Sequence, residues 1–152
     1  MSDVVIAHAT ANDLAAVHQL ESQAFPAPWR REFFESELRA SGRLNLIAKR
    51  DGVLVGYLFS MFFYDEMHVN KIAVVEAERR KGIADTLMAR CFAFAREHEI
   101  RTIALEVRQS NRGAQEFYRH LGFKSAYIRS RYYPDGESAV VMMTSITPRE
   151  SP

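Results

Sequence analysis

The sequence predicts a mixed α/β fold with a parallel step in its second half. Segments with helical spacing of apolar residues alternate with apolar runs typical of strands, in the order β-α-α-β-β-β-α-β-α-β-β. The 152 residues, of which 47% are hydrophobic and 26% charged, suit a single globular domain over residues 1–152. A strand-helix-strand succession in the second half favours a parallel pair, because such a connection is too long for a hairpin.

The first half is expected to hold two helices and four strands. Thr10 and Asp13 form a variant of the capping box that begins a helix, and Phe25-Pro26 ends it because proline lacks an amide donor. Gly42 is expected to close a second, short helix, and the pair Asp51-Gly52 predicts a hairpin turn. The expected strands cover residues 4–7, 44–48, 53–63 and 67–75, and the helices cover residues 10–24 and 29–40.

The second half is expected to hold two helices and three strands. A helix opens within Arg79–Ala84, and its apolar positions share one face. Thr102–Val107 is almost entirely apolar, which is typical of a strand covered on both faces. Cys91 lies on the apolar face of the first of these helices, and we expect a buried, unreactive thiol. The remaining segments are a helix over 112–121, which Gly122 ends, and a hairpin of strands 124–132 and 138–146.

Charge and composition exclude several classes of protein. The formal net charge of +1 argues against a broadly basic nucleic-acid-binding surface. A single cysteine excludes a disulfide framework, and the five histidines lack the spacing of metal ligands, so no metal is expected. No signal peptide is visible, and the most apolar run, Tyr57–Tyr64, is far shorter than the ~20 residues of a membrane helix. We therefore expect a cytoplasmic protein whose ends, residues 1–3 and 148–152, are loose.

The segment Arg79–Ala84 is the most informative one for function. Three consecutive cations precede a helix, where the helix dipole favours acidic residues. The small residues Gly82 and Ala84 allow a ligand to approach the amides of the first turn, so the segment predicts an anion site suited to pyrophosphate. A solvated basic loop is an alternative that the charges alone do not exclude. The segment is neither a Walker A loop nor a dinucleotide fingerprint.

Four segments, in order, resemble the GNAT N-acetyltransferases. These are Asn70–Val74, Arg79–Ala84, Leu105–Asn111 and Phe117–Phe123. The resemblance implies a GNAT fold, with a mostly antiparallel sheet of about seven strands, a central splayed parallel pair and four flanking helices. It also implies acetyl-CoA as co-substrate and no metal. By resemblance, the residues that bind acetyl-CoA are Ile72, Ala73, Val74, Arg79, Arg80, Lys81, Gly82, Ile83, Ala84, Asp85 and Asn111.

Within this family the chain is most similar to the RimI subfamily, the ribosomal-protein-alanine N-acetyltransferases. This likeness rests on three features, namely Glu21 with Phe25–Trp29, the run Leu105–Asn111, and Arg131–Ala139. It implies direct acetyl transfer, in a ternary complex, to the N-terminal α-amine of a protein, with the N-terminal alanine of a ribosomal protein as the preferred acceptor. Lys71 and Arg119 depart from the subfamily pattern, and both shift charge near the expected site. A small amine or a lysine side chain as acceptor, and a regulatory module that binds acyl-CoA without turnover, remain alternatives.

Glu106 is the candidate general base. It is the one charged residue within the apolar strand Ile103–Val107, and alternation places it opposite Ile103, Leu105 and Val107. A carboxylate in such a strand is costly to bury unless it is paired or functional. The structural alternative is a carboxylate at the rim of the sheet, paired with an arginine such as Arg108. By resemblance, Glu106 accepts a proton from the substrate ammonium, through water.

Tyr118 is the candidate general acid. Its position on the inner stripe of a helix is, from spacing alone, typical of core packing. By resemblance it protonates the departing thiolate of CoA, which a phenol with an ordinary pKa of about 10 can do. Asn111 is expected to cap the same helix. Tyr132 and Tyr133 are candidates for contacting the acceptor peptide, with a rigid hairpin bearing exposed aromatic residues as the alternative.

Overall fold

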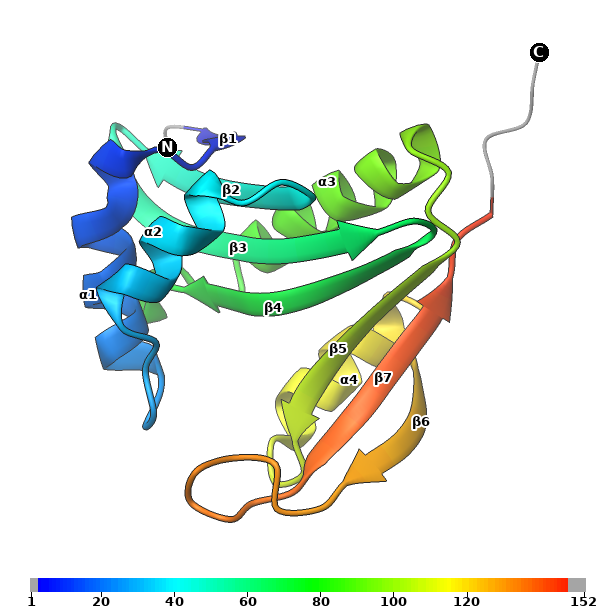
Figure 1. Cartoon of the computed structure of the whole chain (residues 1–152). Helices are drawn as coiled ribbons and strands as arrows, with labels where there is room; N and C mark the ends of the chain where they lie inside the picture. The colour runs from blue at the N-terminus through cyan, green and yellow to red at the C-terminus, as the bar shows by residue number, and fades with distance from the viewer. Residues whose placement is uncertain (1–2, 148–152) are drawn as a thin grey trace. The chain divides into compact units, whose positions relative to one another are not determined.

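The computed structural model describes residues 3–147, and its elements follow the predicted order (Figure 1). Of the ends expected to be loose, all but Asp3 lie outside the described residues. The elements are β1 (Val4–His8), the 3-10 helix η1 (Ala11–Asp13), α1 (Leu14–Ala24), α2 (Arg31–Arg39), β2 (Arg43–Arg50), β3 (Val53–Phe63), β4 (Glu66–Val74), the 3-10 helix η2 (Glu76–Glu78), α3 (Ile83–Glu97), β5 (Thr102–Arg108), α4 (Arg112–His120), β6 (Lys124–Arg129) and β7 (Ala139–Ser145).

The strands form a seven-stranded sheet in the order β1-β2-β3-β4-β5-β7-β6. The pairs β1–β2, β2–β3, β5–β7 and β6–β7 are antiparallel. β4 and β5 are neighbours in this order and are connected by α3, the kind of connection that a parallel pair requires. The fold is the mixed, mostly antiparallel sheet with four α-helices that the sequence predicts.

Two compact units make up the described chain. The first contains the residues up to Phe62 together with Val69–Phe94, and the second contains Phe63–His68 and the residues from Ala95 onward. The first three residues of β4 therefore belong to the second unit and the rest of the strand to the first. Each unit has its own buried apolar residues.

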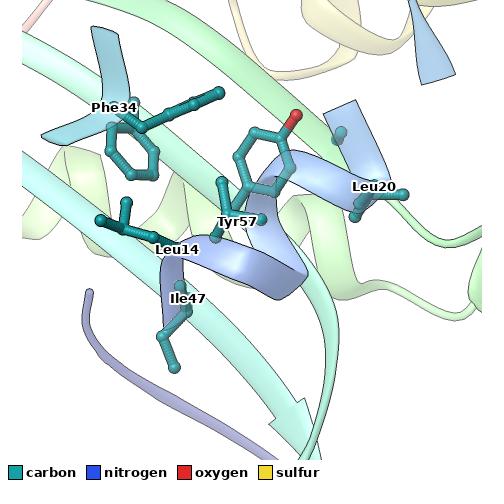
Figure 2. Packing of buried hydrophobic residues seen from close by; sticks show 8 residues of the cluster. Leu14, Leu20, Phe34, Ile47 and Tyr57 are labelled. Atoms are coloured by element: carbon teal, nitrogen blue, oxygen red, sulfur yellow. The ribbon is translucent and has the colours of Figure 1, made fainter. Parts of the chain in front are cut away.

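In the first unit, β3 carries helices on both faces. Tyr57 and Phe59 are fully buried and pack with Phe34 of α2 in edge-to-face geometry, at ring-centroid distances of 6.0 and 5.0 Å. Residues of α1, including Leu14 and Leu20, complete this cluster (Figure 2). The residues of β3 that alternate with Tyr57 and Phe59 point to the other face of the strand, toward α3. A β-carbon added at Gly56, one of these residues, would lie 3.3 Å from a methyl group of Ile83. Figure 1 shows α2 and α3 on opposite sides of β3.

Local signals account for the boundaries in this unit. The Thr10 amide donates to Asp13 Oδ2 at 2.8 Å, so the predicted capping box is present and begins η1, which leads into α1. Asp51 and Gly52 have φ of 52° and 78°, and both values suit the two-residue turn between β2 and β3. Gly42 has φ of 67°, and a β-carbon there would lie 2.8 Å from the Phe62 carbonyl oxygen. The prediction that Gly42 closes the second helix is wrong, because α2 ends at Arg39 with Ala40 as its cap, and Gly42 instead turns the chain into β2.

In the second unit, β5 pairs with β7, and β6 lies at the edge of the sheet. Burial along β5 alternates, with Ile103, Leu105 and Val107 buried and the residues between them half-buried. The expectation that both faces of this strand are covered is therefore wrong, although the predicted placement of Glu106 opposite Ile103, Leu105 and Val107 is confirmed. β6 ends at Arg129 rather than at Tyr132, and Arg131 lies in the left-handed region with φ of 53°.

Candidate functional site

Within the segment Arg79–Ala84, residues 79–82 form an exposed turn that leads into α3. Arg80 and Gly82 have φ of 64° and 82°, so the chain turns sharply twice before α3 begins at Ile83. The first intrahelical hydrogen bond runs from the Thr86 amide to the Gly82 carbonyl at 3.0 Å. The amides of residues 83–85 precede that bond, so the helix itself gives them no acceptor. Together with three exposed cations, this is a suitable arrangement for an anionic ligand.

Acidic and carbonyl oxygens partly balance the cations of this turn. Lys81 Nζ lies 3.8 Å from Glu78 Oε2, and Arg50 of β2 lies 3.2 Å from the same oxygen. Arg79 Nε donates to the Val74 carbonyl at 3.2 Å, which ties the turn to the end of β4. Neither Arg50 nor Glu78 is among the predicted site residues. Arg50 reaches the turn from β2, far away in the sequence, whereas Glu78 directly precedes the three cations and pairs with Lys81.

Gly56 allows β3, β4 and α3 to approach one another closely. A β-carbon at Gly56 would lie 3.0 Å from the Ala73 carbonyl oxygen and 3.3 Å from Ile83 Cγ2. Any larger residue would push apart the end of β4 and the first turn of α3. The structure thus brings Ala73 and Val74 close to Ile83, and all three belong to the predicted acetyl-CoA site. The sequence signal that could have predicted this close approach is the position of Gly56 inside the apolar strand over residues 53–63.

Glu106 lies on β5 with its side chain 11% exposed and is held by two basic groups. Its Oε2 pairs with Nε2 of His68 from β4, and its Oε1 lies 3.4 Å from Arg129 NH1 on β6. The predicted alternative partner, Arg108, is wrong, because Arg108 pairs with Asp135 and Glu137 instead. Glu106 is nonetheless paired with an arginine, and His68 is a neighbour that the sequence analysis did not assign to the site.

Tyr118 and Asn111 occupy the expected places on α4. Tyr118 is 7% exposed, and its ring centroid lies 5.1 and 5.6 Å from those of Phe117 and Phe123. Asn111 is confirmed as the cap, because its Oδ1 accepts from the Ala114 amide at 3.1 Å. Gln115, which the sequence analysis missed, is also buried on this helix and donates to the carbonyls of Arg108 and Gln109 at 3.2 and 3.0 Å. This side chain fastens α4 to the end of β5.

Tyr132 and Tyr133 lie in the loop between β6 and β7 and stack on arginines. The Arg129 guanidinium lies 5.2 Å from the Tyr132 ring, and the Arg108 guanidinium lies 4.1 Å from the Tyr133 ring. Burial raises the pKa of both tyrosines, in the case of Tyr133 to about 12, so both phenols are neutral at physiological pH. The aromatic side chains are thus part of an organised loop, and Tyr132 remains 44% exposed.

Two acidic side chains, Glu137 and Asp135, tie the same loop to the end of β5. Glu137 accepts from the Ser110 amide at 2.8 Å and from Arg108 NH1 at 2.9 Å. Hydrogen bonds from Ser110 and then from Arg108 lower the pKa of Glu137 to about 2. Asp135 adds a second contact to Arg108 NH1 at 2.8 Å. The loop that carries the two tyrosines is therefore held by charge-assisted hydrogen bonds.

In the first unit, Lys71 and Glu21 form a buried ion pair. Lys71 Nζ lies 3.0 Å from Glu21 Oε2 and 4.0 Å from the Phe25 ring centroid. Glu21 also accepts from the Tyr57 hydroxyl and from the Trp29 amide. Burial, and then the charge of Glu21, raise the pKa of Tyr57. Lys71, which departs from the subfamily pattern, thus has a defined partner. Phe25 and Trp29 pack against the core cluster.

Two absences concern metal ions and membranes within residues 3–147. No group of three or more His, Cys, Asp or Glu side chains in this range is placed to hold a metal ion. No helix within the same range is long and apolar enough to cross a membrane.

Comparison with known proteins assigns the chain to a family. The model of the acetyltransferase (GNAT) family matches residues 14–123. The [ribosomal protein bS18]-alanine N-acetyltransferase of Escherichia coli is 32% identical over 138 residues, which cover 89% of this chain and 93% of that protein. An N-alpha-acetyltransferase of Saccharolobus solfataricus is 31% identical, with 92% of each chain covered.

A solved structure agrees with these sequence relatives. The crystal structure of the ribosomal-protein-S18-alanine N-acetyltransferase from Escherichia coli superposes with a TM-score of 0.89 at 30% identity, and covers 98% of this chain and 97% of that one. Family model, sequence relatives and fold thus lead to the same assignment. The chain is a member of the acetyltransferase (GNAT) family and hence an acetyltransferase.

Proposed function

We propose that this chain transfers the acetyl group of acetyl-CoA to the N-terminal α-amine of a protein, and that the N-terminal alanine of a ribosomal protein is its acceptor. The observation that carries this proposal is the 32% identity to the Escherichia coli enzyme over nearly the full length of both chains. We further propose that residues 1–152 act as one acetyltransferase domain, in the cytoplasm, where ribosomal proteins are made. The family match from 14 to 123 includes parts of both compact units, which supports this.

The turn before α3 is the proposed site for the pyrophosphate of acetyl-CoA. Amides of the first turn of α3 and the side chains of Arg79, Arg80 and Lys81 supply donors and positive charge. Gly82 has φ of 82°, and nothing lies within 4 Å of a β-carbon added there, so the backbone is open to a ligand. Ile72–Val74 are proposed to pair with the pantetheine arm, and Asn111 to bind CoA while it caps α4.

Glu106 and Tyr118 are the proposed acid–base residues. Glu106 removes a proton from the substrate ammonium, whose ordinary pKa is about 8, so only modest help is needed. The free amine attacks the thioester carbonyl, a C–N bond forms, and the C–S bond breaks. Tyr118 donates its proton to the CoA sulfur. No covalent intermediate on the enzyme is needed, and much of the rate comes from holding the two substrates together.

Tyr132 and Tyr133 are proposed to contact the acceptor peptide. Tyr132 is exposed, and the Arg108–Glu137 contact holds the loop that carries both rings in one conformation. A rigid aromatic surface of this kind binds a peptide at a low entropic cost.

The departures at Lys71 and Arg119 bear on which acceptor is preferred. Lys71 is already neutralised by Glu21, so it adds no unpaired charge.

A thiol-release assay tests the proposal. Peptides beginning with Ala, Ser, Met and Thr are compared with small amines and with a peptide whose only free amine is a lysine side chain. We expect turnover to be highest with the Ala peptide. Turnover only with small amines or lysine would assign a different acceptor, and acetyl-CoA binding without any turnover would indicate a regulatory module.

Glu106→Gln tests the proposed base in the same assay. The amide keeps the size of the carboxylate but cannot accept the ammonium proton, so turnover should fall by about 100-fold or more. The dissociation constant for acetyl-CoA, measured by calorimetry, should stay nearly the same. Glu116→Gln, on the exposed face of α4, is the matched control and should leave both quantities unchanged. Unchanged turnover in Glu106→Gln would remove Glu106 from the role.

A further inference from the structure

One carboxylate of the protein faces the positive turn before α3 and is shared by two cations. Oε2 of Glu78, at the end of η2, lies 3.2 Å from Arg50 NH2 and 3.8 Å from Lys81 Nζ. Arg50 reaches it from the end of β2, 28 positions earlier in the chain, and all three residues belong to the first compact unit. The proposed phosphate site is therefore bordered by a negative charge of the protein itself.

The two contacts of Glu78 are unequal. In the pair with Arg50, the arginine and glutamate side chains are 19% and 17% exposed, so salt and water screen it little. The pair with Lys81 is longer, and the Lys81 side chain is 44% exposed. An exposed pair of this kind contributes little free energy. Arg50 is therefore the anchor of Glu78, and Lys81 can exchange the carboxylate for another anion.

We propose that Glu78 is an internal counter-ion of the donor site, which the pyrophosphate of acetyl-CoA displaces from Lys81 while Arg50 keeps it in place. This inference rests on the proposed function and names two further residues that set the affinity for the donor. The pyrophosphate carries two negative charges where the carboxylate carries one, so it competes effectively for Lys81. The shared contact on Oε2 is the observation that carries the inference.

The counter-ion weakens the binding of donor and product alike. Acetyl-CoA and CoA have the same pyrophosphate, which is remote from the reacting thioester. Binding energy at such a group is equal in the ground state and the transition state, so it lowers KM without raising kcat. It also slows the release of CoA, a step that limits the turnover of many enzymes. Competition from Glu78 thus keeps the affinity moderate and favours product release.

Arg50 acts through Glu78 and is a positioning residue. Its guanidinium holds the carboxylate from the side of β2, so that only the long contact to Lys81 remains for the ligand to break. Without Arg50, the carboxylate would pair with Lys81 alone and oppose the ligand more strongly. Arg79 has a different role, because its Nε donates to the Val74 carbonyl at 3.2 Å.

Calorimetry of the full chain with acetyl-CoA, CoA and inorganic pyrophosphate tests the counter-ion. Glu78→Gln should lower all three dissociation constants by about 3- to 10-fold, because one charge of the same sign as the ligand is removed. KM for acetyl-CoA should fall by a similar factor, kcat should not rise, and inhibition by CoA should become stronger. Glu76→Gln, which removes an exposed carboxylate from the same 3-10 helix, is the matched control and should change each constant by less than about twofold.

Arg50 variants separate anchoring from direct contact with the phosphate. Arg50→Gln should raise the dissociation constant for pyrophosphate by about 3- to 10-fold, and in the Glu78→Gln background the same substitution should change it by less than about twofold. Arg50→Lys keeps the charge and should restore the affinity of the unchanged chain. Equal effects of Arg50→Gln in both backgrounds would show that Arg50 attracts the ligand directly, and its anchoring role would be wrong.

A second pair of variants keeps the test decisive if Arg50→Gln does not fold. Lys81 is exposed, so Lys81→Gln should leave the fold intact. In the Lys81→Gln background the cation for which Glu78 competes is gone, and Glu78→Gln should then tighten pyrophosphate binding by less than about twofold. Tightening as large as in the unchanged background would mean that Glu78 acts by its general charge and not by competition for Lys81.

The outcomes distinguish this inference from the proposed function itself. If the unchanged chain binds acetyl-CoA and acetylates a peptide, but Glu78→Gln fails to tighten binding or Glu76→Gln tightens it equally, the counter-ion is wrong and the proposed function stands. If the unchanged chain binds no acetyl-CoA, the proposed function is overturned and the counter-ion falls with it.

Discussion

Lys71 Nζ lies 3.0 Å from Oε2 of Glu21, and the Glu21 side chain is fully buried. The Lys71 side chain is 15% exposed and also sits over the Phe25 ring. The second carboxylate oxygen of Glu21 accepts from Tyr57, so the charged pair is embedded in hydrogen-bonding and aromatic partners. A pair of this kind contributes little net stability when complete, but it is costly to break, because the remaining charge is left buried.

The first prediction concerns the free energy of unfolding of Lys71 and Glu21 variants. Lys71→Met and Glu21→Gln should each lower it by about 3–5 kcal/mol, since each leaves its partner without an opposite charge. The double variant should lose clearly less than the sum of the two. Urea denaturation measures all three. Lys81→Met, which removes an exposed pair with Glu78, is the control and should cost less than about 1 kcal/mol. Additive losses in the double variant would contradict the pairing.

The second prediction concerns the hydroxyl of Tyr118. Tyr118→Phe keeps the ring contacts with Phe117 and Phe123, so the free energy of unfolding should change by only about 1 kcal/mol. Turnover should fall by about 10- to 100-fold, because the CoA thiolate loses its proton donor. Steady-state kinetics with saturating acetyl-CoA measures this. Tyr127→Phe, on an exposed position of β6, should leave turnover unchanged. If Tyr118→Phe kept full turnover, Tyr118 would contribute only to packing and not to proton transfer.

The third prediction concerns acid stability. The pKa of Glu137 lies at about 2 in the folded protein, below its ordinary value of 4.5, because Ser110 and Arg108 donate to the carboxylate. A lowered folded-state pKa contributes stability that is present above pH 4.5 and is lost as the pH falls toward 2. Glu137→Gln should therefore lower Tm at pH 6, and the difference from the unchanged chain should shrink toward pH 2. Thermal melts across this range measure it.

A matched control for the acid-stability prediction is Glu116→Gln. The Glu116 side chain is 66% exposed and contacts only the exposed Arg119 side chain among the ion pairs of the described residues. Its Tm should follow that of the unchanged chain at every pH. A difference between Glu137→Gln and the unchanged chain that stayed constant down to pH 2 would show that Glu137 acts by packing and not by charge.

The fourth prediction concerns the reactivity of Cys91. This thiol is fully buried on α3, and burial raises its pKa to about 12. A disulfide reagent needs the thiolate and access to it, so the native protein should react only as fast as it opens or unfolds. Reaction should become complete in denaturing urea. Ser22→Cys, which adds a thiol at an exposed position of α1, should react within the mixing time and serves as the positive control. Fast reaction of the unchanged native chain would contradict the burial of Cys91.

Several boundaries of the fold, and parts of the candidate site, follow from local signals in the sequence. Thr10, Asp51-Gly52 and Asn111 act within a few residues of themselves, and the structure confirms each as a cap or turn. The same holds for the alternation that places Glu106 opposite the buried residues of β5. Such features depend on φ preferences, amide donors and the period of a strand, which neighbouring residues set without help from the rest of the chain.

The sequence by itself determined the order of the elements, the positive turn before α3 and the isolated carboxylate of β5. Only the tertiary structure decided which charges meet. Glu106 pairs with His68 and Arg129 rather than with Arg108, and Lys71 pairs with Glu21, 50 positions away. The physical reason is that many side chains of equal charge compete for each partner. The strand order and register, which arise from burying apolar surface over the whole chain, bring only one combination within contact distance.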